Sequence, residues 1–167
     1  SYGNLTPLNL VDPYTINKDA PEKGYYIIKK LIQNGADINN MDSEGFTLFI
    51  SVCVYYSEDM IEYLLKIPNL DINKRLDGAD GAIHKIFLTY FMSEYRGNVL
   101  STLKKILKKD GLDINLRGEN GDTVLHILAN EDRKQDPGYS DDKLKKLTIL
   151  LIEKGIDPNI KNDRGKL

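Results

Sequence analysis

The sequence predicts an all-α fold in which helix–turn–helix units stack along one axis, because two short motifs recur in register. The first motif occurs four times, as GADIN at 35–39, NLDIN at 69–73, GLDIN at 111–115 and GIDPN at 155–159. The second lies between copies of the first and reads LTPLNLV at 5–11, FTLFISVC at 46–53, GAIHKIF at 81–87 and DTVLHILA at 122–129. Self-similarity at a spacing of about 20 to 50 residues is typical of repeat architectures.

An amphipathic stretch precedes each copy of the first motif and predicts a helix. The four stretches are 25–34, 58–68, 99–110 and 143–154. In the last one, leucines recur at helical spacing at positions 144, 147 and 151, and lysines fill the opposite face. Asp141 and Asp142 suit the N-terminus of this helix, where carboxylates meet free amides. Gly155 suits the left-handed position that follows its end, and Gly35 and Gly111 suit the same position after their helices.

The second motif predicts a shorter helix in each unit. Thr6, Thr47 and Thr123 precede the apolar residues of their motifs and are placed to cap this helix. Pro7 fits the first helical position, where the missing N–H has no consequence. Each unit is therefore predicted to contain a turn, a short helix, a longer helix and a further turn.

The two motifs in this register resemble the ankyrin repeat, whose pattern places Gly-x-Thr-Pro-Leu-His before one helix and Gly-Ala-Asp-Val-Asn after a second, over about 33 residues. The resemblance covers nearly the whole chain and implies one domain, 1–167. It implies an ankyrin-repeat solenoid of helix–turn–helix units joined by β-hairpin-like turns. We expect repeats at about 1–39, 40–73, 74–115 and 116–159, and the start of a further repeat at 160–167.

Three units are longer than the ankyrin length, and the extra residues lie between the two helices. They fall at about 12–23, 90–98 and 131–142, and two of these segments are rich in Pro, Gly, Asp and Asn, which favours loops. Neither end of the chain shows an obvious polar cap, which a terminal repeat needs. We therefore expect a longer parent protein.

The residues that could carry chemistry fit the scaffold better. His84 and His126 lie 42 residues apart, which is one unit length, and the resemblance implies that each hydrogen-bonds its turn and ties neighbouring repeats together. Cys53 stands where the ankyrin pattern has an alanine, so we expect a small buried side chain. The sequence therefore predicts no catalytic site, no metal and no cofactor, and we expect that the protein is not an enzyme.

Composition narrows the classes of partner. The net charge is −2, with 23 basic and 25 acidic residues, so nothing draws the chain as a whole to nucleic acid or to an anionic membrane. A single cysteine fits a reducing compartment, and a bias toward Ile, Lys, Asn and Tyr is associated with intracellular bacteria and large DNA viruses. We expect a monomeric domain in the cytoplasm, or in the host cytosol if the source is a pathogen, with a protein as partner.

The ankyrin resemblance implies that the partner binds to the turn tips and to the exposed end of each short helix. The candidate residues are Tyr14, Ser43, Glu44, Phe46, Val54, Tyr55, Asp77, Asp80, Leu88, Glu119, Asn120, Asp122 and Asn130. Tyr14, Phe46 and Tyr55 are candidate aromatic anchors. The acidic side chains of this set in the third and fourth units predict attraction to a basic partner.

The function predicted on these grounds is a non-catalytic protein–protein interaction module, with recruitment or sequestration of a host protein as the specific interpretation. One alternative is the recognition arm of a larger enzyme or ubiquitin-type adaptor whose active domain lies outside this chain. Another is an ankyrin domain that binds a small molecule or an oligonucleotide through tyrosines and lysines. The lysines in question, which we expect to form solvated faces, are Lys104, Lys105, Lys108, Lys109, Lys143, Lys145 and Lys146.

Overall fold

The computed structural model describes residues 6–11, 21–55, 58–92, 99–130 and 141–167. Their helices are α2 (Pro21–Gln33), α3 (Leu48–Tyr55), α4 (Glu58–Leu65), α5 (Ala82–Met92), α6 (Val99–Ile106), the 3-10 helix η1 (Glu119–Gly121), α7 (Val124–Ala129) and α8 (Asp141–Glu153). Within these ranges no strand occurs, and one antiparallel bridge joins Met41 to Thr47. The predicted all-α class is confirmed.

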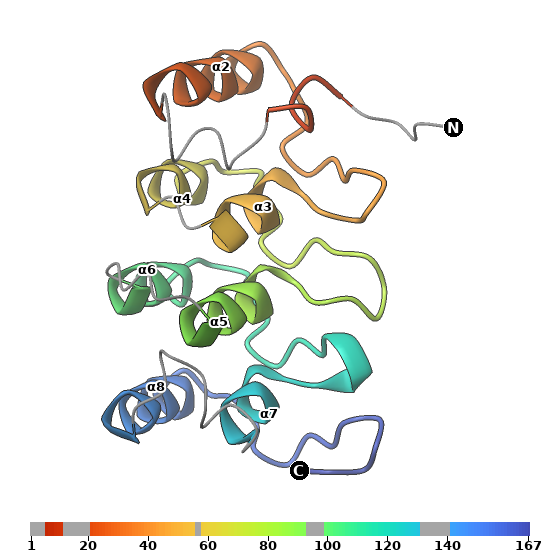
Figure 1. Ribbon diagram of the computed structural model, residues 1–167, viewed down its shortest axis with the longest axis vertical. Coiled ribbons are helices and arrows are strands. Elements are labelled where there is room, and N and C mark those ends of the chain that lie inside the picture. The colour runs from red at the N-terminus through yellow and green to blue at the C-terminus, as the bar shows by residue number, and fades with distance from the viewer. Residues whose placement is uncertain (1–5, 12–20, 56–57, 93–98, 131–140) are drawn as a thin grey trace.

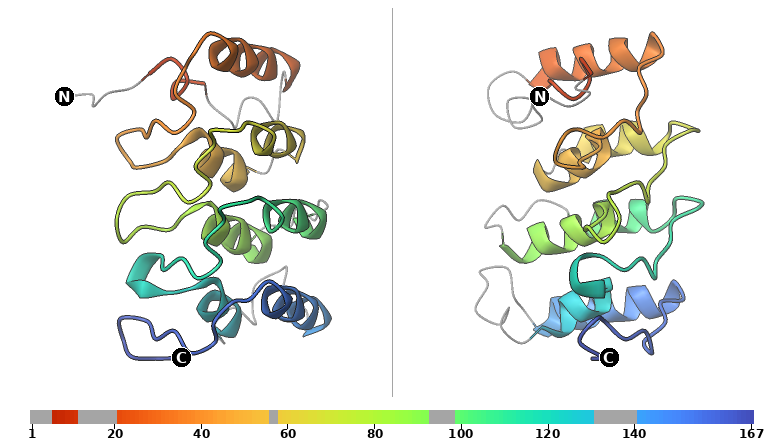
Figure 2. Two further views of the ribbon diagram at one scale, coloured as in Figure 1. Left: turned by 180° about the vertical axis from the view of Figure 1, so that it is seen from behind. Right: turned by 90° about the vertical axis from the view of Figure 1, so that its right-hand side faces the viewer.

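The helices form two columns, and the turns form a third (Figure 1). Helices α3, α5 and α7 make the inner column, next to the turns, and α2, α4, α6 and α8 make the outer one; Figure 2 shows the same columns from behind and from the side. Helix α3 packs against α5 and α5 against α7, while α4 packs against α6. Contacts therefore run between neighbouring helix pairs, as in a solenoid.

A continuous strip of buried apolar side chains runs through the stack. It includes Ile28 of α2, Phe49 of α3, Ile86 of α5, Val124 of α7 and Leu151 of α8, all at most 1% exposed. Cys53 is also fully buried, as its motif position predicts, and burial raises the pKa of its thiol.

Several of the predicted helix starts and stops are present. The hydroxyl of Thr47 accepts a hydrogen bond from the backbone N–H of Ile50 at 3.2 Å and so caps α3. Gly35 follows α2 with φ of 86°, and the next N–H, of Ala36, reaches back to the Leu31 carbonyl at 3.0 Å. This left-handed stop satisfies carbonyls that the helix end leaves free, and Gly155 repeats it after α8.

Three local predictions were wrong. Helix α2 begins at Pro21, so residues 21–23 are helical and not part of a loop, and α5 continues to Met92 through residues 90–92. The described residues 6–11 form a hydrogen-bonded turn and no helix. Here the Thr6 hydroxyl donates to Asn9 at 2.8 Å, a local bond that competes with helix formation. The remaining insertion residues, 12–20, 93–98 and 131–140, lie outside the described part.

The Asp-x-Asn of the first motif forms the joint between units. The Asp37 carboxylate accepts the N–H of Asn39 at 2.9 Å, which fixes the turn. The Asn39 side chain then donates to the Asn69 carbonyl at 2.7 Å and accepts the N–H of Asp71 at 2.8 Å. Asn73 makes the same two bonds with Gly111 and Asp113, at 2.6 and 2.9 Å. Asn115 repeats one of these bonds by accepting the N–H of Asp157 at 2.7 Å, so the recurring motif marks recurring hydrogen bonds between units.

Candidate partner-binding surface at the turn tips

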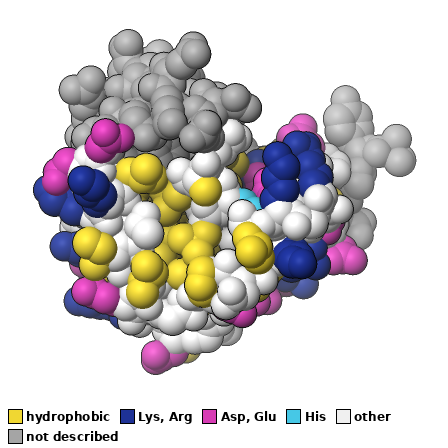
Figure 3. Space-filling view, turned by 90° about the horizontal axis from the view of Figure 1, so that it is seen from below, with side chains coloured by type: hydrophobic (Ala, Val, Ile, Leu, Met, Phe, Trp, Pro, Cys, Tyr) yellow, Lys and Arg dark blue, Asp and Glu magenta, His cyan; other side chains and the backbone are white. Residues whose placement is uncertain are grey.

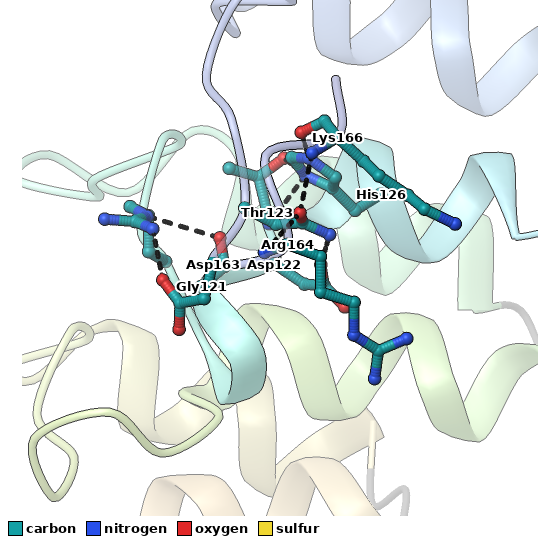
Figure 4. Close-up of polar contacts among 9 residues, drawn as sticks. Gly121, Asp122, Thr123, His126, Asp163, Arg164 and Lys166 are labelled. Carbon is teal, nitrogen blue, oxygen red and sulfur yellow. Dashed lines mark hydrogen bonds and ion pairs between the residues drawn. The ribbon is translucent and has the colours of Figure 1, made fainter.

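Both histidines brace the turns. The Nδ1 atom of His126 accepts the N–H of Thr123 at 3.1 Å, and its Nε2 lies 3.1 Å from the Lys166 carbonyl (Figure 4). Because a carbonyl oxygen only accepts, Nε2 carries the proton. His84 repeats the arrangement with the N–H of Gly81 at 3.2 Å and the Leu116 carbonyl at 3.0 Å. Each imidazole thus ties its own turn to the next unit, as predicted.

The fourth tip, at 118–122, is partly occupied by the turn that follows it. The side-chain amide of Asn162 donates to the Asp122 carboxylate at 2.8 Å, and the N–H of Asp163 donates to the Asn120 carbonyl at 2.9 Å. Arg117 and Asp163 add an ion pair of 2.6 Å. Two candidate partner-binding residues, Asn120 and Asp122, therefore also hold the neighbouring turn.

Asp80 has the same internal role in the third unit. One of its oxygens accepts the N–H of Glu119 at 3.0 Å, and the other pairs with the ammonium of Lys85 at 3.2 Å. Its side chain is only 8% exposed, so little of it is available to a partner. Of the four predicted acidic residues in the third and fourth units, Asp80 and Asp122 serve the scaffold, while Asp77 and Glu119 are exposed.

The other candidate residues fall into three groups. Ser43, Glu44 and Asn130 are exposed, whereas Phe46, Val54 and Leu88 are half-buried. Tyr55 is the last residue of α3, but its side chain lies outside the described part. Tyr14 lies entirely outside the described part. Among the predicted aromatic anchors, only Phe46 can be placed on the surface.

The second and third tips, at 42–46 and 76–80, border an open pocket of about 360 Å³, here called the tip pocket. Its apolar wall consists of Phe46 and Ile50 from the second unit and Leu76 and Ala79 from the third. Leu76 is 44% exposed, so part of this apolar wall faces solvent. The structure brings Glu44, Phe46, Asp77 and Glu119 of the predicted set together around this space.

Leu76 shapes the tip pocket, and the sequence interpretation missed it. At the same place in the second unit, Asp42 accepts the N–H groups of Glu44 and Phe46, both at 2.9 Å. Leu76 lies instead against Gly45, so closely that a Cβ at Gly45 would collide with it. The sequence did contain a signal for this difference, because Leu76 is an apolar residue at a turn position where the second unit has Asp42.

The lining of the tip pocket is strongly acidic. It contains the carboxylates of Glu44, Asp77, Asp80 and Glu119 and the single ammonium of Lys85, so its formal charge is −3. Lys85 pairs with Asp80. Within the described residues, no hydrogen bond or ion pair reaches the other three carboxylates. The pocket therefore combines an apolar wall with unneutralised negative charge.

Comparison with known structures identifies the fold. The crystal structure of an ankyrin repeat protein matches 99% of this chain and 72% of its own length, with a TM-score of 0.69 and 23% sequence identity. This chain has the ankyrin-repeat fold. No family model matches the sequence.

Two curated proteins are similar in sequence to part of this chain. A probable serine/threonine-protein kinase of Dictyostelium discoideum is 26% identical over 93 residues, and delta-latroinsectotoxin-Lt1a of Latrodectus tredecimguttatus is 32% identical over 94 residues. Each match covers 56% of this chain. The matched segments span only 10% and 6% of the relatives' own lengths.

On the outer side of the stack, three of the lysines expected to be solvated are engaged: Lys146 pairs with Asp142 of its own helix at 2.6 Å, and Lys105 and Lys109 reach the neighbouring unit. Lys105 of α6 pairs with Glu58 at 3.3 Å and with Glu62 at 2.8 Å, and this bond to Lys105 lowers the pKa of Glu62. The ammonium of Lys109 donates to the carbonyls of Leu65 and Ile67 at 2.9 and 3.3 Å, just where α4 ends. Both side chains therefore join adjacent units, which weakens the oligonucleotide alternative.

The lower end of the ankyrin stack is apolar (Figure 3). Leu125, Leu128 and Ala129 of α7 and Leu144 of α8 line a second pocket there, of about 270 Å³.

In the described part of the chain, no group of three or more His, Cys, Asp or Glu could hold a metal ion. No described helix has both the length and the apolar character needed to cross a membrane.

Proposed function

We propose that this chain is a non-catalytic module that holds a partner protein against its turn tips. The tip pocket is the observation that carries this proposal, because it pairs an exposed apolar wall with exposed carboxylates. An apolar centre with a charged rim is the usual anatomy of a protein interface. The general role of the ankyrin fold in protein–protein interaction supports the same conclusion.

The chemistry of the described residues favours binding over catalysis. Cys53 is fully buried and its thiol pKa is raised, so little nucleophilic thiolate forms. The hydroxyl of Thr123 lies 2.9 Å from Nδ1 of His126, a spacing that could activate a nucleophile. Thr123, however, is only 1% exposed, so a substrate could not approach its hydroxyl.

In the cell, this module would recruit or sequester its partner in the cytoplasm, or in a host's cytosol if the source is a pathogen. It would act as a monomer, because each tip presents its surface without a second copy. Neither nucleic acid nor a membrane would be required. The two relatives do not specify the partner, since the matched segments are a small part of each.

Site-specific photo-crosslinking tests the proposal. A photoreactive amino acid replaces Asp77 at the third tip or, as the control, Lys104 on the exposed outer face of α6. In cells that naturally produce the protein, we expect Asp77 to yield one prominent protein crosslink that Lys104 does not yield. Equal crosslinking from both positions, or none from Asp77 with any protein, would overturn the proposal.

A second candidate is the recognition arm of a larger enzyme or adaptor. The observation that favours it is that both curated matches are short segments of much longer proteins. An antibody raised against this chain would then detect a native protein well above 19.0 kDa. A native protein of the same mass as the chain would contradict this candidate and leave the binding proposal intact.

A further inference from the structure

We propose that the tip pocket receives an arginine side chain from an exposed segment of the partner. This inference rests on the proposed protein-binding function and specifies the chemistry of the partner. Three features of the pocket carry it: its size, its apolar wall and the arrangement of its charges.

The size of the tip pocket suits one long side chain. Its volume of about 360 Å³ lies near the lower end of the range of about 300–1,000 Å³ for ligand pockets. The wall formed by Phe46, Leu76 and Ala79 offers apolar contact to a side chain in the pocket. Arginine and lysine have aliphatic stems that pack on such surfaces while their charged ends stay near solvent.

The charges favour a cation at the rim of the pocket. Glu44, Asp77 and Glu119 come from three successive tips and line the same pocket. Each is exposed, and no described residue neutralises its carboxylate. Three like charges gathered around one space repel each other, so an incoming cation relieves this repulsion as well as forming its own contacts.

Arginine fits better than lysine for two reasons. Its planar guanidinium has five donors, which can serve carboxylates on different sides, whereas an ammonium acts as a compact point charge. Guanidinium groups also stack on aromatic faces, and Phe46 provides one. The Lys85 ammonium already lies 6.0 Å from the centroid of the Phe46 ring, so this ring accommodates a cation.

The test uses nuclear magnetic resonance of the 15N-labelled chain with the tripeptide acetyl-Ala-Arg-Ala-amide. A matched tripeptide carries citrulline, which keeps the shape of arginine but has no charge. We expect the arginine peptide to shift the backbone amide signals of Gly45, Leu76, Gly78 and Glu119 in a saturable way. We expect the citrulline peptide to bind about tenfold more weakly or not at all, as the loss of a charge-assisted contact predicts.

Charge-neutralising variants distinguish binding in the tip pocket from general attraction to acidic surfaces. The variant E44Q/D77N/E119Q should bind the arginine peptide at least about tenfold more weakly, and its unchanged spectrum elsewhere would show that it folds. The control E22Q/D110N/E153Q makes the same change in net charge at exposed positions outside the pocket and should bind as wild type does. Equal weakening in both variants, or amide shifts spread over all acidic surfaces, would contradict the proposal.

Two further outcomes would also overturn it. If lysine in place of arginine binds equally well, the pocket does not recognise a guanidinium. If spermidine shifts the same amides as strongly as the arginine peptide, the site binds any polyvalent cation and not a protein side chain.

The proposed function can survive the failure of this inference. If no arginine peptide binds, but Asp77 still forms a specific crosslink to a partner, the tips bind a protein through other chemistry. If the crosslink is also absent, the proposed function fails as well. The two results are therefore read from separate experiments.

Discussion

The side chain of Asn73 accepts a hydrogen bond at 2.9 Å from the backbone N–H of Asp113, which lies 40 residues further along the chain. The same side chain donates to the carbonyl of Gly111 at 2.6 Å. One amide thus satisfies a donor and an acceptor of the following unit, where a turn would otherwise leave them to solvent. Asn73 therefore links the end of the second unit to the end of the third through two hydrogen bonds.

We predict that Asn73→Ala destabilises the protein by about 1–3 kcal/mol, because two hydrogen bonds to the next unit are lost at about 0.5–1.5 kcal/mol each. Asn159→Ala is the matched control. Asn159 has the same place in its motif, but the only hydrogen bonds described for it are to Asp157 in its own turn. Urea unfolding followed by circular dichroism measures both, and equal losses would show that the bridge between units contributes nothing.

Lys109 provides a second test of the joints. We predict that Lys109→Met lowers the free energy of unfolding by about 1–2 kcal/mol, because its ammonium donates to two carbonyls at the end of α4. The neighbouring Lys108→Met should change stability by less than about 0.5 kcal/mol, since Lys108 is exposed and its side chain makes no hydrogen bond or ion pair with the described residues. Thermal unfolding compares the two. Equal effects would mean that only charge, and not the placement of Lys109, matters.

Sequence periodicity predicted the fold because several repeated residues have the same task in successive units, as Asn39 and Asn73 do at their joints. The asparagines of the first motif and the histidines of the second were predictable for this reason. The roles of Asp80 and Asp122 were harder to predict, because an aspartate in a turn has the same sequence pattern whether it contacts a partner or the next turn. The tip pocket could not be predicted, since it depends on how Leu76 covers Gly45 in the neighbouring unit.

His84 makes stability depend on pH. Burial lowers the pKa of its imidazole, and the nearby carboxylate of Asp80 opposes this shift only in part. The folded state therefore binds the proton less readily than the unfolded chain, whose histidine pKa is about 6.5. Stability from this group is fully present at higher pH and is lost as the pH falls through about 6.5 toward the folded value. A second proton, on Nδ1, would also remove the acceptor for the Gly81 N–H.

We predict that wild type loses stability between pH 7.5 and 5.5, with a slope of at most about 1.4 kcal/mol per pH unit from one proton. His84→Gln should be less stable at pH 7.5 but should show a smaller slope across this range. Urea unfolding at several pH values provides the measurement. If the slopes of the two proteins are the same, His84 is not the group responsible.

Alanine substitutions at two glycines of the tips distinguish the effect of backbone strain from the effect of a contact with Leu76. Gly45 has φ of 83° and Gly78 has φ of 71°, so alanine at either position should destabilise by about 1–2 kcal/mol. A Cβ at Gly45 would also meet Leu76, whereas a Cβ at Gly78 would meet open space. We therefore predict that only Gly45→Ala shifts the methyl signals of Leu76 strongly in nuclear magnetic resonance spectra. Comparable shifts in both variants would show that Leu76 does not rest on Gly45.

One position of the second motif lies in two different environments in the third and fourth units. Ile83 and Leu125 both directly precede the histidine of their motif, but Ile83 is 2% exposed between α3 and α7, while Leu125 is half-buried at the apolar end of the stack. Ile83→Ala should therefore cost about 2–5 kcal/mol, because it leaves a cavity between packed helices. Leu125→Ala should cost clearly less, since solvent already reaches that side chain. Urea unfolding decides, and equal losses would mean that a neighbouring unit adds nothing to the burial that stabilises this position.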